Sequence, residues 1–140
     1  MSKSSYSYSF LKGIVICHGK SEKLICEFLR SNLRIQIEID SDKKGKKSIQ
    51  ITSIMKFLSG EKYKNIASFK NKFDDIEQIK DKKKLPSYFK IFIIMDTDDC
   101  NENQKKSFKD KSMFKEHWLY DYIVPIYNDS NLGKRTCPQN

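Results

Sequence analysis

Four short apolar runs alternate with stretches of helical periodicity along the chain. The runs at 13–17, 34–39, 88–95 and 122–127 are rich in β-branched and aromatic residues, as strands are. The run at 34–39 alternates strictly, which predicts a half-buried strand near an edge of the sheet. The run at 88–95 is continuous and the most apolar in the chain, which predicts a central strand covered on both faces. The last run contains Pro125, which has no N–H to donate, so we expect an edge or irregular strand there.

Apolar residues recur at helical spacing between these runs. Residues 22–32 are predicted to form an amphipathic helix with Ser21 as its N-cap, because four apolar side chains share one face: Leu24, Ile25, Phe28 and Leu29. Further helical patterns cover 48–59 and 62–80, and another helix is predicted at 110–121. The stretches between these segments are polar and are expected to be loops.

The alternation of strands and helices predicts β–α–β crossovers. We therefore expect an α/β fold of three layers, Rossmann-like, with about four mostly parallel strands and helices on both faces. A chain of 140 residues suits a single domain. We expect a polar lead-in at 1–11, one α/β domain over 12–127, and an irregular tail over 128–140. The polar stretches 40–47 and 100–110 are predicted loops within that domain.

Charge changes this picture, because 27 Lys and Arg residues face only 18 Asp and Glu, for a net charge of +9. A basic surface favours polyanions such as DNA or RNA. Only three of the 27 are Arg, so we expect attraction to phosphates rather than readout of bases. The alternative is that the lysines only solvate the surface. Two lysine runs are candidates for contact with a nucleic-acid backbone: Lys43, Lys44, Lys46 and Lys47, and Lys82, Lys83 and Lys84.

The pattern also argues against several classes of protein. No run approaches 18 apolar residues, so no membrane span is predicted, and the N-terminus lacks the apolar segment of a secretory signal. The four cysteines show no C-x-x-C spacing, and Cys17 and Cys26 fall within core patterns. We therefore expect a reducing, cytoplasmic location. A zinc site that uses Cys100 and His117 is an alternative.

The first motif that carries chemistry is C-H-G-K-S-E at 17–22, between the first strand and the helix after it. Ligands of open α/β sheets bind at the carboxyl ends of strands. Gly19 permits close backbone approach, the helix N-terminus attracts phosphate, and Lys20 adds a positive charge. Gly19 and Lys20 are therefore predicted to bind phosphate. A tight strand-to-helix turn with ordinary capping would explain the same residues.

The second motif is I-M-D-T-D-D at 94–99, directly after the most apolar strand. Asp96 and Asp98 share one side of an extended backbone, since side chains repeat every two residues. Clustered carboxylates beside a core repel one another unless a cation compensates them. Mg²⁺ is the usual compensating ion, because it takes oxygen ligands. The alternative is an Asp-rich loop that caps the next helix.

Together the two motifs resemble those of the Toprim (topoisomerase–primase) superfamily, in particular its small nuclease-type members. That family has hydrophobic-hydrophobic-Glu-Gly-x-x-acid after its first strand and Asp-x-Asp after its third. The counterparts here are I-C-H-G-K-S-E at 16–22 and M-D-T-D-D at 95–99, and the resemblance covers about 12–127. It implies divalent-metal-dependent phosphodiester chemistry on nucleic acid, a nuclease in the first place, with defence against phages or mobile elements as a setting.

One position departs from the family's pattern, because His18 stands where the family has Glu. Histidine can act as an acid or base near neutral pH but is a poor ligand for Mg²⁺. Either Glu22 supplies the carboxylate, or the metal shifts towards Mn²⁺, or the site is inactive. The resemblance implies Mg²⁺ or Mn²⁺ as cofactor, with catalytic residues His18, Glu22, Asp96 and Asp98, and metal ligands Glu22, Asp96, Asp98 and Asp99.

Two other functions stay open. One is a catalytically inactive module that binds nucleic acid or a nucleotide, or regulates a protein partner. The other is a TIR-like signalling domain, since some of these also carry H-G-x-x-E after a first strand, although they lack the Asp-x-Asp strand end. A homo-oligomer is compatible with each function.

Of the remaining residues, Glu38 and Asp40 could join the acid cluster. The aromatic series Phe114, Trp118 and Tyr122 is interpreted as core.

Overall fold

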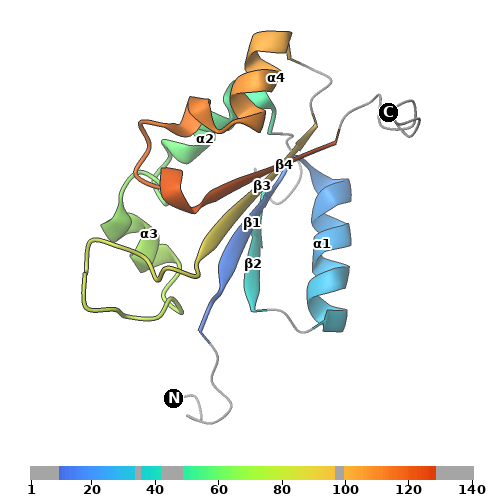
Figure 1. Cartoon of the computed structure of the whole chain (residues 1–140). Helices are drawn as coiled ribbons and strands as arrows, with labels where there is room; N and C mark the ends of the chain where they lie inside the picture. The colour runs from blue at the N-terminus through green and yellow to red at the C-terminus, as the bar shows by residue number, and fades with distance from the viewer. Residues whose placement is uncertain (1–9, 34–35, 42–48, 97–99, 129–140) are drawn as a thin grey trace, which may run out of the picture.

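The computed structural model of the chain describes residues 10–33, 36–41, 49–96 and 100–128. Within these ranges, the side chains of six residues are not described: Lys20, Ser21, Glu22, Leu33, Asp96 and Asn128. Four strands form one parallel sheet in the order β2-β1-β3-β4 (Figure 1). The strands are β1 (Gly13–Cys17), β2 (Ile37–Asp40), β3 (Lys90–Asp96) and β4 (Ile123–Asn128). The predicted α/β class with about four parallel strands is confirmed.

The central strands are β1 and β3, which are neighbours in the sheet. β1 pairs with β2 as far as Ile16–Asp40 and with β3 as far as Cys17–Ile94. The predictions of a central apolar strand near 88–95 and an edge strand near 34–39 are both confirmed. β4 lies at the other edge, where the missing N–H of Pro125 is tolerated.

Close packing of β1 against β3 explains the glycine with which β1 begins. A Cβ atom on Gly13 would lie 2.6 Å from the carbonyl oxygen of Lys90, nearer than such atoms approach. Only a residue without a side chain fits there. The two central strands are thereby held at close range from their first residues onward.

Helices cover both faces of the sheet, as predicted (Figure 1). On one face lies α1 (Lys20–Leu33), and on the other lie α2 (Ile54–Leu58), α3 (Ile66–Lys72) and α4 (Glu102–Lys109). Three short 3₁₀ turns complete the described elements: η2 (Ile51–Ser53), η3 (Ser112–Phe114) and η4 (Tyr120–Tyr122). Among the described residues no helix is long and apolar enough to cross a membrane.

Two helical patterns are much shorter in the structure than in the prediction. The pattern over 48–59 divides into η2 and α2, and the pattern over 62–80 gives only the seven residues of α3. Asn65 caps α3 by accepting a hydrogen bond from the backbone N–H of Ser68 at 2.8 Å. Phe73 and Ile76 are buried although they follow the helix, so their spacing reflects burial and not helical structure.

The predictions for 100–110 and 110–121 were wrong, because the helix lies in the polar stretch. α4 is stabilised by a capping box in which Asn101 and Gln104 each accept a backbone N–H of the other, at 2.8 and 2.9 Å. The stretch 110–121 instead forms η3 and the start of η4. Local capping therefore outweighs the apolar spacing downstream.

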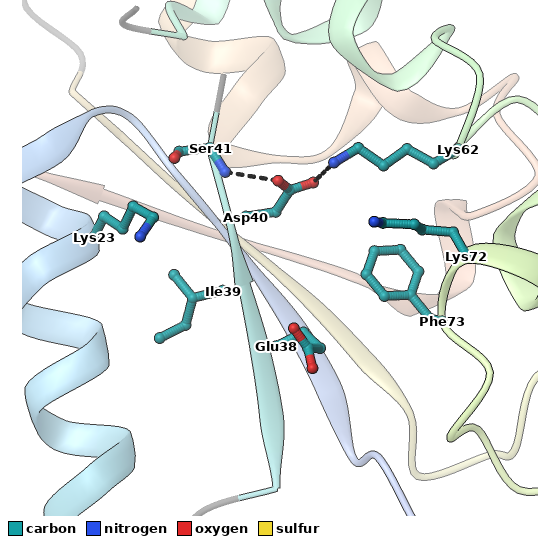
Figure 2. A pocket seen from close by; sticks show the side chains of 8 residues that line it. All are labelled: Lys23, Glu38, Ile39, Asp40, Ser41, Lys62, Lys72 and Phe73. Atoms are coloured by element: carbon teal, nitrogen blue, oxygen red, sulfur yellow. Dashed lines mark hydrogen bonds and ion pairs between the residues drawn. The ribbon is translucent and has the colours of Figure 1, made fainter. Parts of the chain in front are cut away.

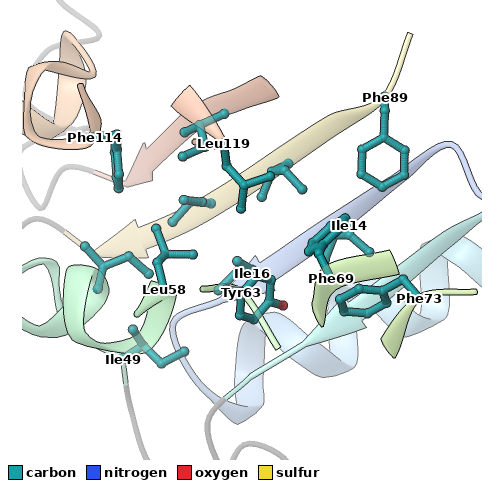
Figure 3. Packing of buried hydrophobic residues seen from close by; sticks show 14 of the residues in the cluster. Ile14, Ile16, Ile49, Leu58, Tyr63, Phe69, Phe73, Phe89, Phe114 and Leu119 are labelled. Carbon is teal, nitrogen blue, oxygen red and sulfur yellow. The ribbon is translucent and has the colours of Figure 1, made fainter. Parts of the chain in front are cut away.

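The main core lies between the sheet and the helices α2, α3 and α4 (Figure 3). Alternate strand residues such as Ile14, Ile16 and Ile93 pack there with fully buried aromatic rings, Tyr63, Phe69, Phe89, Phe108 and Phe114. Trp118 and Tyr122 are partly buried against the same cluster. The interpretation of the aromatic series as core is confirmed.

Helix α1 begins earlier than predicted, at Lys20. The carbonyl of Gly19 accepts the N–H of Lys23 at 3.1 Å, so Gly19 and not Ser21 occupies the N-cap position. The helix is amphipathic as predicted, but its apolar residues do not face the sheet. Leu24, Ile25, Phe28 and Leu29 are between 47% and 67% exposed.

Candidate functional site

The two predicted motifs follow neighbouring strands at the end of the sheet where the strands finish. We call this end the carboxyl edge. β1 and β3 run parallel, and their last hydrogen-bonded pair is Cys17–Ile94. His18 comes one residue beyond that pair on β1, and Asp96 comes two residues beyond it on β3. Neighbouring strands lie about 4.8 Å apart, so the backbones of His18 and Asp96 lie near each other at the carboxyl edge.

Between β1 and β3 the chain also reverses the direction in which it adds strands to the sheet. From β1 the chain passes through α1 to β2, and from β3 it passes through α4 to β4 on the opposite side. α1 and α4 cover opposite faces (Figure 1). In open α/β sheets, ligands bind at such a switch point, in a crevice outside the carboxyl ends of the strands.

Several predicted site residues lie outside the described part of the chain. Asp98 and Asp99 belong to segment 97–99, and the predicted backbone contacts Lys43, Lys44, Lys46 and Lys47 belong to segment 42–48. For Lys20 and Glu22 only the backbone is placed, in the first turn of α1, and for Asp96 only the backbone at the end of β3. The metal site and its ligands stay a prediction.

His18 is anchored to a segment that is distant in the sequence. Its ring Nδ1 lies 2.8 Å from the carbonyl oxygen of Ile49, and its own carbonyl accepts the N–H of Ile49 at 2.7 Å. Because a carbonyl can only accept, Nδ1 carries the proton, and the lone pair of the neutral ring is on Nε2. Nε2 is therefore the atom of His18 that can exchange a proton or bind a ligand.

Asp40, at the end of β2, is committed to other protein groups. Its Oδ2 accepts from Lys62 Nζ at 2.7 Å and from the Tyr63 hydroxyl at 2.5 Å, and its Oδ1 accepts the N–H of Ser41 at 2.9 Å. Burial, and then the nearby charge of Asp40, raise the pKa of the Tyr63 phenol well above its usual value. This network satisfies the Asp40 carboxylate within the protein. That Asp40 joins the acid cluster stays a prediction, because the side chains of that cluster are not among those described.

A pocket of about 450 Å³ opens beside the same end of β2 (Figure 2). Lys23 lies on one side of the strand, and Lys62 and Lys72 lie on the other. The remaining lining residues are Glu38, Ile39, Asp40, Ser41 and Phe73. The buried hydroxyl of Ser41 has no hydrogen-bond partner among the described residues. Sequence reasoning missed this pocket because its lysines come from three separate segments.

The second lysine run has a different place in the fold. Lys82, Lys83 and Lys84 are exposed on the loop that leads to the amino end of β3, so they lie towards the edge opposite His18 (Figure 1). The pocket lined by Lys23, Lys62 and Lys72, which we call the lysine pocket, is much closer to the carboxyl edge. The reason is that β2 ends beside β1 at Ile16–Asp40.

His117 is structural and not a zinc ligand. Its Nδ1 accepts the N–H of Leu119 at 3.1 Å, and its Nε2 donates to the carbonyl of Leu58 at 2.9 Å. Both ring nitrogens are thus occupied, which rules out the alternative with Cys100. Among the side chains that the structure describes, no three His, Cys, Asp or Glu residues gather as a metal site. The predicted ligands Glu22, Asp96, Asp98 and Asp99 are not among those side chains.

Comparison of the chain with protein-family models, with curated proteins and with solved structures finds no match. The case for a function therefore depends on the residues and on their positions in this fold.

Proposed function

We propose that the chain is a divalent-metal-dependent enzyme that cleaves phosphodiester bonds in nucleic acid. The observation that carries the proposal is the position of both motifs at the switch point between β1 and β3. A ligand in that crevice would meet His18 and the first turn of α1 on one side, and the carboxylates that begin at Asp96 on the other.

The residue types fit a hard divalent cation. Asp96 and Asp98 would hold Mg²⁺ or Mn²⁺ with Glu22 or Asp99, because such ions prefer oxygen ligands. When bound, the ion would polarise a phosphoryl oxygen and lower the pKa of a water molecule. His18, whose Nε2 carries the lone pair, would act as general acid or base. The backbone amides that follow Gly19 would face a phosphate at the start of α1.

The charge of the chain supports a nucleic-acid substrate. The net charge is +9, and three lysines line the pocket beside the carboxyl edge, Lys23, Lys62 and Lys72. Two of these lysines are paired with carboxylates, Lys62 with Asp40 and Lys23 with Glu27. Among the described residues Lys72 has no such partner, so it is the pocket lysine that would meet a phosphate of a bound nucleic-acid strand.

A cleavage assay tests this function. DNA and RNA are incubated with the wild type and with Asp96→Asn, in Mg²⁺, in Mn²⁺ and in chelator. We expect metal-dependent cleavage by the wild type and a loss of at least about a hundredfold in the variant, since the substitution removes a charged ligand. Asp121→Asn is the matched control, because Asp121 is exposed in η4 and away from the crevice.

Three results would decide against the enzyme. They are cleavage that persists in Asp96→Asn, cleavage that survives chelator, and no cleavage of either nucleic acid by the wild type. Salt-sensitive binding without cleavage would instead identify the non-catalytic module, which the lysine pocket alone would support. Absence of both binding and metal-induced thermal shift would favour the signalling domain.

A further inference from the structure

Helix α1 packs on the sheet through its polar face and presents its apolar face to solvent. At 100° per residue, Leu24, Ile25, Phe28 and Leu29 form one side of the helix, and all four are substantially exposed. We call these four residues the α1 stripe. They are a majority of the seven large apolar side chains that are exposed in the described structure.

The opposite side of α1 faces the protein. Cys26 Sγ lies 3.9 Å from Sγ of Cys17, which is fully buried in β1. Lys23 and Glu27 form an ion pair on this side, and both are less exposed than the α1 stripe. The orientation of the helix is thus set by contacts to β1 and β2, and it turns the α1 stripe away from the sheet.

The sheet beside α1 is also incompletely covered. α1 packs against β1 and β2, and the register places Phe92 and Ile94 of β3, with Val124 and Ile126 of β4, on the same face as Val15 and Cys17. These four residues keep part of their surface exposed, with Ile126 at 40%. One helix does not cover four strands, so β3 and β4 keep apolar surface exposed on the face of the sheet that carries α1.

We propose that the α1 stripe is a dimer interface, which a second copy of this chain covers by packing its own α1 against it about a twofold axis. A twofold contact joins identical patches, so the patch must complement itself. A stripe made only of apolar side chains meets this condition. Each copy carries a net charge of +9, so close approach requires a patch without positive charge, and the α1 stripe has none.

The exposed area is compatible with such a dimer. Four large side chains with about half of their surface exposed offer on the order of 400 Å² per copy, which is in the range of functional patches. Two copies would bury about twice that from the α1 stripe alone. Contacts of the partner with the exposed surface of β3 and β4 would have to supply the rest of the roughly 1,200 Å² at the lower end of specific interfaces.

The test is the mass of the full chain in solution as a function of concentration, by sedimentation velocity. We expect the wild type to change from 16.5 kDa to twice that mass as its concentration rises. Phe28→Asp should remain at the monomer mass and keep its far-ultraviolet circular dichroism and melting temperature, because Phe28 is the most exposed residue of the stripe. Asn71→Asp adds the same charge at an exposed position of α3, on the other face of the sheet, and should dimerise as the wild type does.

The proposal is overturned if the wild type stays monomeric at every concentration, in which case another partner or another part of the chain covers the stripe. It is overturned equally if Phe28→Asp still dimerises. Loss of helical signal in Phe28→Asp would also overturn it, because that result would place Phe28 in the core of the monomer. Leu24→Ser provides a second, uncharged variant with the same expected outcome.

Discussion

At the residue scale, Tyr63 connects the core with the end of β2. Its ring is fully buried beside Phe69 and Phe73, and its hydroxyl donates to Asp40. The carbonyl of Tyr63 accepts the indole N–H of Trp118 at 2.9 Å. A buried tyrosine needs a partner for its hydroxyl, and here that partner is the carboxylate that also binds Lys62.

The raised pKa of Tyr63 predicts a loss of stability in alkaline solution. The folded state favours the neutral phenol, whereas an unfolded tyrosine ionises near pH 10. Stability from this group is therefore complete below about pH 10 and falls as the pH rises further, because only the unfolded state releases the proton. Urea denaturation at pH 8 and pH 10.5 should show a smaller decrease for Tyr63→Phe than for the wild type.

Tyr127→Phe is the control, because Tyr127 is a tyrosine on the edge strand β4 whose side chain is substantially exposed. Its alkaline loss of stability should match that of the wild type. Equal losses for the wild type and Tyr63→Phe would contradict the assignment. The Tyr63–Asp40 bond itself was beyond sequence reasoning, since 23 residues separate the partners and neither belongs to a motif.

At the scale of elements, the strands were predicted more accurately than the helices, among which only α1 lies close to its predicted range. All four strands lie where the apolar runs predicted them, within a few residues. The signal is strongest for the central strands β1 and β3, because parallel strands covered on both faces must be apolar nearly throughout. The apolar spacing at Phe73 and Ile76 resembled that of a helix, but the residues are buried from irregular backbone. Helix α4 was missed because only the two residues of its capping box, Asn101 and Gln104, distinguish it from a polar loop.

The capping box of α4 can be tested directly. Asn101→Ala removes the acceptor for the N–H of Gln104, and loss of such a cap costs about 1 kcal/mol of unfolding free energy. Asn103→Ala is the matched control, because Asn103 is exposed within the same helix and alanine is the better helix former. Chemical denaturation should show destabilisation for Asn101→Ala only. Equal stability of the two variants would show that the box contributes nothing.

At the scale of the whole molecule, the layers that cover the two faces of the sheet differ in thickness. One face supports three helices and nearly all of the buried aromatic rings, and the other supports α1 alone. The sequence predicted helices on both faces but not this asymmetry, because periodicity identifies an apolar stripe without showing what the stripe contacts. The same limit applies to the candidate site. The motifs predicted that it lies at the carboxyl ends of the strands. The lysine pocket could not be predicted, because its lining residues come together only through tertiary contacts.

The lysine pocket predicts how nucleic-acid binding responds to salt. If the pocket contacts one phosphate, Lys72→Ala should weaken binding for all sequences and reduce the slope of log affinity against log salt concentration by about 1. Lys72 is suitable because Lys62 is tied to Asp40. Lys84→Ala, at the opposite edge, should leave binding of short oligonucleotides unchanged. Fluorescence anisotropy over a salt series measures both, and equal slopes would exclude the pocket.

The single tryptophan of the chain lies in the thicker layer, on the face of the sheet that α2, α3 and α4 cover. Trp118 packs edge-on against Phe69 and donates its N–H to the carbonyl of Tyr63, both on the face of the sheet opposite α1 (Figure 1). Its emission should therefore report on unfolding of the α2–α4 layer and stay constant if α1 alone detaches or melts. Circular dichroism would register the loss of those 14 helical residues. The protein thus carries an intrinsic optical probe that separates local opening of one layer from global unfolding.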